Sequence, residues 1–291
     1  MSRTVTFTGA ENNDLVADVH DGEGDVVALL MHGGGQTRYS WHAAARRMAA
    51  AGITAITTDA RGHGDSSWVS SRAYAFPRMA ADLARLADQV TQRFARPILV
   101  GASMGGLAGM YACRERPDMF RAMVFVDITP RMEPSGVDRI LGFMAARAEE
   151  GFGSVEEAAE AVAAYMPNRK RSASRDGLLK NLRQREDGRW RWHWDPAFVS
   201  GPEPITDGKG EEAERRFAEG LSRVTVPILL VRGSRSELVS EAAVAAFMQA
   251  APHAKFVDVS GAGHMVVGDR NDVFADAVIE FIGGLASSSG R

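Results

Sequence analysis

Short apolar runs alternate along this chain with longer stretches in which apolar residues recur every three or four positions. A short continuous apolar run is typical of a strand buried on both faces, whereas the longer spacing is typical of one face of a helix. The alternation predicts an α/β fold in which helices cover both faces of a parallel sheet. The runs that we interpret as strands cover residues 26–31, 53–58, 98–100, 123–126, 227–231 and 256–259.

The middle third of the chain breaks this alternation. Residues 130–219 have helical spacing, for example over residues 155–165, and contain no convincing strand pattern. This predicts a helical lid that is inserted into the fold. Residues 1–129 and 220–291 would then form the core domain.

Composition and charge exclude several kinds of site. The chain has 291 residues, 45% of them hydrophobic and 24% charged, which is enough to bury a large core. The formal net charge is -3 and the one basic run, residues 169–171, is short, so no nucleic-acid partner is expected. A single cysteine, Cys113, excludes an internal disulfide and cysteine-rich metal sites. We expect no metal and no cofactor.

We expect no targeting signal in the N-terminal residues. Residues 1–7 lack the apolar core of a signal peptide, and no run approaches the roughly 18 apolar residues of a membrane span. A cytoplasmic protein without a membrane partner is therefore expected. The oligomeric state stays open between monomer and homodimer.

Residues 98–106 carry the clearest chemical signal, because an apolar strand runs into a Gly-x-Ser-x-Gly turn and then into a helical pattern. A serine at the apex of such a turn is strained and projects its hydroxyl from the sheet edge, which makes Ser103 a candidate nucleophile. Gly101 and Gly105 keep Cβ atoms out of the crowded corner. The alternative is a glycine-rich loop with a surface serine, since the motif also occurs by chance.

A glycine-rich segment, residues 32–36, follows the strand at residues 26–31. Its glycines allow backbone N–H groups to point into a cleft and stabilise an oxyanion, and we expect Gly34 to supply one donor. The N–H of Met104, directly after the candidate nucleophile, would supply the other. A phosphate-binding loop is the weaker alternative, because the lysine and the glycine spacing of such loops are missing.

Two further loops hold a candidate base and a candidate acid. His264 lies on a glycine-flanked loop after the last predicted strand, where it could accept the serine proton. Glu237 follows the strand at residues 227–231 and could orient the imidazole. A single histidine is more often structural, but the order Ser103, Glu237, His264 is that of one of the three common serine triads.

With these motifs in order, the chain resembles the α/β-hydrolase superfamily, and in particular its lid-bearing serine enzymes, which are similar to esterases, cofactor-free peroxidases and epoxide-hydrolase relatives. The resemblance implies a mostly parallel eight-stranded sheet with an antiparallel second strand and a lid after the sixth strand. It also implies an architectural role for residues 59–66, so Arg61 and His63 are not expected to be catalytic. The matching segments are residues 32–35, 59–66, 101–106 and 261–264.

One residue departs from the family pattern. Relatives most often carry aspartate where this chain has Glu237, and some use an acid at the end of the sixth strand, where Asp127 lies. We take Glu237 as the preferred acid and Asp127 as the alternative.

The predicted function is hydrolysis of a carboxylic ester of a small hydrophobic substrate through an acyl-enzyme on Ser103. Epoxide hydrolases and haloalkane dehalogenases of this superfamily use aspartate as the nucleophile, so a serine argues against both. Carbon–carbon bond hydrolysis, lactone opening and perhydrolysis need the same groups and stay as alternatives. A slow or non-catalytic ligand receptor is the alternative from another class, because fold alone does not fix function.

Three of the five tryptophans lie in residues 190–196 of the predicted lid. In an extended segment, Trp190, Trp192 and Trp194 would all lie on one side. They could form an aromatic wall of the substrate pocket or could anchor the lid to the core by packing, and both interpretations stay open.

Overall fold

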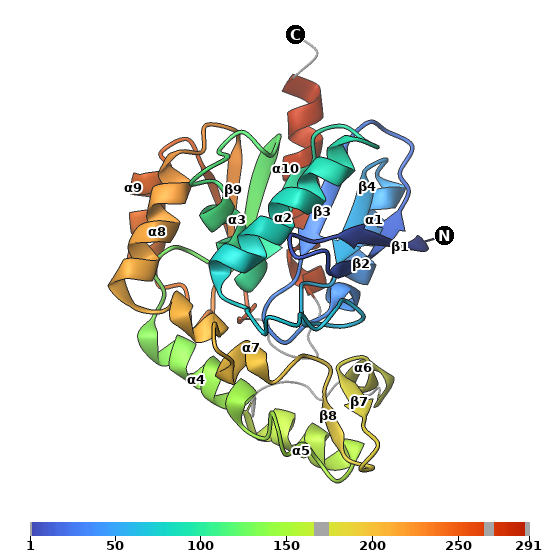
Figure 1. Ribbon diagram of the computed structural model, residues 1–291. Coiled ribbons are helices and arrows are strands. Elements are labelled where there is room, and N and C mark those ends of the chain that lie inside the picture. The colour runs from blue at the N-terminus through green and yellow to red at the C-terminus, as the bar shows by residue number, and fades with distance from the viewer. Residues whose placement is uncertain (1, 166–174, 265–270, 289–291) are drawn as a thin grey trace.

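The computed structural model describes residues 2–165, 175–264 and 271–288, and its central element is a sheet of eight strands (Figure 1). The strand order is β1-β2-β4-β3-β5-β6-β9-β10, and β2 runs antiparallel to both of its neighbours while the pairs from β4 to β10 are parallel. This confirms the expected eight-stranded, mostly parallel sheet with an antiparallel second strand. The strands are β1 (Ser2–Thr8), β2 (Asp14–His20), β3 (Val27–Met31), β4 (Thr54–Thr58), β5 (Ile98–Ala102), β6 (Ala122–Val126), β9 (Ile228–Gly233) and β10 (Lys255–Val259).

Helices cover both faces of the sheet. α1 (His42–Ala50) and α10 (Ala275–Ser288) pack on one face. The other face is covered by α2 (Phe76–Thr91), α3 (Met104–Ala112), α8 (Gly210–Ser222) and α9 (Glu241–Ala250). Every residue of β3, β4, β5 and β6 is buried, which is the physical reason for their continuous apolar runs.

The segment that we interpret as a lid lies between β6 and β9, at one end of the sheet (Figure 1). It contains α4 (Pro134–Ala145), α5 (Val155–Tyr165), α6 (Arg175–Leu179), α7 (Ala197–Ser200) and a short 3-10 turn, Ile205–Gly208. Two strands, β7 (Leu182–Gln184) and β8 (Trp190–Trp192), pair as an antiparallel hairpin. The expectation of a lid without strands is therefore wrong, because three-residue strands are too short to show a period of two.

The lid ends earlier in the structure than the expected boundary at residue 219. α8 lies beside α3 on the face of the sheet, so it is a helix of the core. A Cβ atom on Gly220 would lie 1.7 Å from the carbonyl oxygen of Met110, so the two helices touch through their backbones. In the part of the chain that the structure describes, no helix has the length and apolar character to cross a bilayer.

Candidate active site

Ser103 occupies a sharp junction between β5 and α3. Its φ is 45°, a left-handed value that is strained for a residue with a Cβ atom. The flanking glycines are sterically required, since a Cβ on Gly101 would lie 2.6 Å from the nitrogen of Gly106 and one on Gly105 would lie 2.6 Å from the Cβ of Met31. The strained turn that the motif predicts is therefore present.

His264 is held by an aspartate at the end of β6. Its Nδ1 lies 2.7 Å from Oδ2 of Asp127, and the two side chains are only 8% and 3% exposed. Asp127 accepts two further hydrogen bonds, from the N–H of Gly233 at 3.0 Å and from the hydroxyl of Ser236 at 2.8 Å. These donors satisfy and orient the carboxylate, so Asp127 can fix the imidazole in one tautomer.

The structure places Asp127, and not Glu237, against His264, so the preferred acid is corrected to the alternative one. Glu237 bonds to the guanidinium of Arg139 at 2.7 and 2.6 Å, and its side chain is 56% exposed. The turn after β9 explains the difference. It directs Ser236 inward to Asp127, and the Ser236 hydroxyl also accepts two backbone N–H groups, which leaves the next side chain facing outward.

Ser103 and His264 line the same cavity, which has a volume of about 80 Å³. Among the described lining residues, Lys209 is the one with a full charge, and its Nζ lies 2.8 Å from Oδ1 of Asp138. The remaining walls are almost entirely apolar. They are formed by Phe76, Leu107, Met132, Val137, Ile140, Leu141, Met144, Phe198, Ile205 and Leu238.

The two expected oxyanion donors meet at this cavity. Gly34 and Met104 both line it, and neither of their N–H groups has a hydrogen-bond acceptor within residues 2–165, 175–264 and 271–288. Met104 is the first residue of α3, where the helix dipole favours negative charge. The neighbouring Gly33 N–H, by contrast, donates to the side chain of Gln36 at 3.0 Å. The arrangement can therefore stabilise an anionic oxygen next to Ser103.

Two buried histidines hold the glycine loop. His32 donates from Nδ1 to the carbonyl of Gly33 at 2.8 Å and accepts at Nε2 from a backbone N–H. His63 accepts the N–H of Gly35 at Nε2, at 3.2 Å, and its Nδ1 lies 3.0 Å from a carbonyl. Each ring has one donor and one acceptor as its partners, so each is neutral. Burial lowers the pKa of His32 and lowers that of His63 to about 3.

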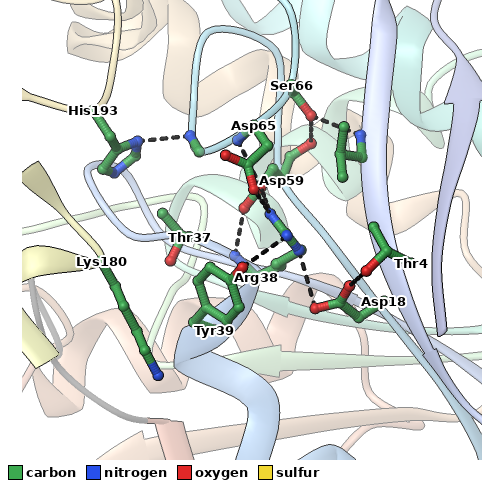
Figure 2. Close-up of polar contacts among 12 residues, drawn as sticks. Thr4, Asp18, Thr37, Arg38, Tyr39, Asp59, Asp65, Ser66, Lys180 and His193 are labelled. Carbon is green, nitrogen blue, oxygen red and sulfur yellow. Dashed lines mark hydrogen bonds and ion pairs between the residues drawn. The ribbon is translucent and has the colours of Figure 1, made fainter. Parts of the chain in front are cut away.

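Arg38, three residues after Gly35, is the centre of a largely buried ionic cluster (Figure 2). The Arg38 guanidinium bonds to Asp59, to Asp18 at 3.0 Å and to Asp65 at 2.8 Å, and its side chain is 4% exposed. Burial raises the pKa of Asp18, but hydrogen bonds and the charge of Arg38 outweigh it and bring the pKa well below its usual range. The cluster ties β2 to residues 59–66, which agrees with an architectural role for that segment.

The tryptophans of the lid do not line the cavity that contains Ser103. Trp192 and Trp194 are 2% and 1% exposed, and their rings stack at 5.1 Å with an interplanar angle of 9°. Trp192 also packs against Phe143 and Phe152 inside the lid. The interpretation as an aromatic pocket wall is thus wrong for Trp190, Trp192 and Trp194. Trp192 is buried within the lid, whereas the ring of Trp194 lies 6.4 Å from that of His63 in the core, which supports the alternative of a packing anchor for this residue.

In the described part of the chain, no three histidine, cysteine, aspartate or glutamate side chains converge as metal ligands. Sequence reasoning gave no role to His32 and none to His193, another buried histidine. A lone histidine inside an apolar or glycine-rich segment carries no signal that separates a buried, hydrogen-bonded ring from an exposed one.

Comparison with known proteins adds independent findings. The model of the alpha/beta hydrolase family matches residues 28–277. The esterase Rv0045c of Mycobacterium tuberculosis is 27% identical over 266 residues, which cover 88% of this chain and 81% of the esterase. The 2-(acetamidomethylene)succinate hydrolase of Mesorhizobium japonicum is 31% identical over 242 residues, 79% of this chain and 78% of that enzyme. A crystal structure of E-2-(acetamidomethylene)succinate hydrolase superposes with a TM-score of 0.80 at 25% identity, covering 97% of this chain and 99% of the other.

Proposed function

This chain belongs to the alpha/beta hydrolase family, and from that premise we propose that it hydrolyses carboxylic esters of small hydrophobic substrates through an acyl-enzyme on Ser103. One observation carries the proposal. The Asp127–His264 pair and Ser103 meet at one apolar cavity, together with the two N–H donors of Gly34 and Met104.

The proposed reaction follows the usual logic of a serine triad. Because Nδ1 of His264 is bonded to Asp127, Nε2 is the atom that takes the hydroxyl proton of Ser103. The serine oxygen then attacks the ester carbonyl carbon, and the oxyanion that forms accepts the N–H groups of Gly34 and Met104. The C–O bond to the alcohol breaks as the alcohol takes the proton from His264. Water repeats the sequence on the acyl-enzyme and releases the acid.

The walls of the cavity favour an uncharged, apolar acyl group. Transfer of methylene groups from water to such walls is favourable by about 0.8 kcal/mol for each CH₂. The relative named as a hydrolase of 2-(acetamidomethylene)succinate acts, by its name, on a dicarboxylate. Here Lys209 is already paired with Asp138, so the cavity offers little compensation for two carboxylates. Resemblance to the esterase fits this cavity better.

Ester turnover by the wild-type protein and by Ser103→Ala tests the proposal. We expect hydrolysis of p-nitrophenyl acetate and butyrate by the wild type, covalent labelling by a fluorophosphonate probe, and loss of both in Ser103→Ala. Wild-type turnover in Ser103→Ala would overturn the proposal. Tight ligand binding without product release would favour the receptor, and selective turnover of lactone, peracid or carbon–carbon substrates would favour the related chemistries.

We also propose that the protein is cytoplasmic and that its partner is a small-molecule substrate. Fractionation of the producing cell tests the location. Sedimentation of the purified protein distinguishes a monomer from a homodimer.

A further inference from the structure

His193, on the lid, reaches the glycine loop that carries the proposed oxyanion donor. It directly follows β8, is 1% exposed, and its own N–H donates to the carbonyl of Asn181 at 3.0 Å, which fixes its backbone to the lid. Figure 2 shows its ring pointing from the lid toward the loop that holds Asp59 and Asp65. This histidine therefore connects the lid to the loops of the core that surround the site.

The two ring nitrogens of His193 have different partners. Nδ1 accepts the N–H of Gly64 at 2.6 Å, and Nε2 donates to the carbonyl of Gly35 at 3.3 Å. Because one partner is a donor and the other an acceptor, the ring is neutral with its proton on Nε2. Burial and the neighbouring His63 keep the pKa of His193 well below its usual value.

The three buried histidines hold three consecutive peptide units of the glycine loop. His32 bonds to the carbonyl of the Gly33–Gly34 unit, His63 to the N–H of the Gly34–Gly35 unit, and His193 to the carbonyl of Gly35. Glycines impose few limits on their own φ and ψ, so the direction of each peptide plane has to come from such partners. The first of these units carries the Gly34 N–H, the proposed oxyanion donor.

We propose that His193 is a positioning residue that the lid supplies to orient the oxyanion loop, so that the lid contributes to rate as well as to substrate fit. The inference rests on the proposed ester hydrolysis. A hydrogen bond to a developing oxyanion depends steeply on direction and distance, so a small rotation of the Gly34 peptide weakens transition-state binding more than ground-state binding. The expected signature is a lower kcat at a nearly unchanged KM.

Other contacts hold the lid on the core without His193. The hydroxyl of Tyr74 donates to Asp195 at 2.7 Å, and the N–H of Asp195 donates to the carbonyl of Gly62 at 3.0 Å. Arg183 bonds to Asp65 at 3.1 Å. Substitution of His193 therefore removes two hydrogen bonds while these attachments stay, and the variants should fold.

Three substitutions separate positioning from packing. His193→Gln places an amide N–H where Nε2 lies and can still donate to Gly35, whereas His193→Asn places a carbonyl where Nδ1 lies and can only accept from Gly64. His193→Phe fills the volume with neither. We expect kcat to fall about 10- to 100-fold in the Phe and Asn variants, with KM within about 2-fold, and to recover to within about 3-fold in the Gln variant.

His253→Gln is the matched control, because His253 is exposed and its Nε2 also bonds to a backbone carbonyl, that of Val226 at 3.1 Å. We expect wild-type kcat for it. A kcat within about 2-fold of wild type in His193→Phe would overturn the proposal, as would equal kcat values in the Asn and Gln variants.

Hydrogen exchange at the Gly35 amide gives a readout that needs no substrate. This amide bonds to His63, and we expect its exchange to accelerate about 10-fold or more in His193→Phe but not in His193→Gln. Unchanged exchange in the Phe variant would overturn the inference. If the wild type hydrolyses no ester while the exchange pattern holds, the proposed function fails and the positioning of the loop by His193 stands.

Discussion

Asp127 is the residue whose surroundings say most about its role. Its φ of 51° is unusual for an aspartate, and its carboxylate is fully engaged by a backbone N–H, a hydroxyl and His264. A strained, buried carboxylate that is held by three donors is typical of a pre-organised site. Glu237, in contrast, forms an ion pair with Arg139 that is exposed to water and therefore contributes little to the stability of the fold.

Substitution of the two acids provides a direct test at this scale. We expect Asp127→Asn to lower kcat for p-nitrophenyl butyrate about 10³- to 10⁴-fold, because the amide no longer holds the His264 tautomer that accepts the serine proton. Glu237→Gln is the control of matched chemistry and should keep kcat within about 2-fold. A large loss of kcat in Glu237→Gln alone would return the acid role to that residue.

At the scale of elements, the sequence predicted those features that depend only on the local pattern of apolar residues and glycines. The buried strands and the strained turn at Ser103 follow from apolar spacing and glycine placement. Two features were not predictable in this way. The hairpin of β7 and β8 is too short to show alternation, and the assignment of α8 to the core depends on its tertiary contact with α3.

α4 supplies much of the apolar wall of the cavity and should set the acyl length. Ile140 faces the cavity from this helix, so Ile140→Trp should fill part of it. We expect kcat/KM for octanoate esters to fall about 10-fold or more, with acetate esters within about 3-fold. Ala145→Trp, at an exposed position of the same helix, is the control and should leave the chain-length profile unchanged. Equal losses for acetate and octanoate in Ile140→Trp would contradict the assignment of this wall.

The contact between α3 and α8 is testable through one glycine. Gly220→Ala places a methyl group against the carbonyl of Met110 and should force the helices apart, lowering the free energy of unfolding by about 2 to 3 kcal/mol. In Gly142→Ala, on α4, the added Cβ meets nothing within 4 Å, so this control should be neutral or slightly stabilising. Urea denaturation measures both, and an unchanged midpoint in Gly220→Ala would mean that α8 is not seated on α3.

At the scale of the whole molecule, the site is assembled by strand order. Asp127 directly follows β6, which pairs with β5, the strand that leads into Ser103. His264 follows β10, which lies beyond β9 at the edge of the sheet. The sequence places both Asp127 and Glu237 at strand ends but does not encode which one turns inward, because that depends on the loop after β9. The role of His193 is likewise not encoded locally, because its two hydrogen-bond partners lie 129 and 158 residues away along the chain.

Buried neutral histidines should make the stability of the whole fold sensitive to mild acid. Burial lowers the pKa of His20, His32, His63 and His193, that of His63 to about 3. Below about pH 6.5, the pKa of a histidine in the unfolded chain, the unfolded chain binds protons that the folded chain does not bind. The contribution of these rings to the free energy of unfolding is therefore fully present above this pH and falls as the pH drops. Each ring contributes up to about 1.4 kcal/mol per pH unit to the slope of the free energy of unfolding against pH. Above about pH 5 the carboxylates of the unfolded chain stay ionised and add little to this slope.

Urea denaturation between about pH 7.5 and pH 5 measures this slope. We expect the free energy of unfolding to fall steadily below about pH 6.5 in the wild type. His193→Gln removes one titrating ring, so its slope should be shallower by up to about 1.4 kcal/mol per pH unit, whatever its stability at neutral pH. His253→Gln, which removes an exposed ring, should keep the wild-type slope. An identical slope in His193→Gln would mean that folding does not lower the pKa of His193, which would contradict the expected effect of its burial.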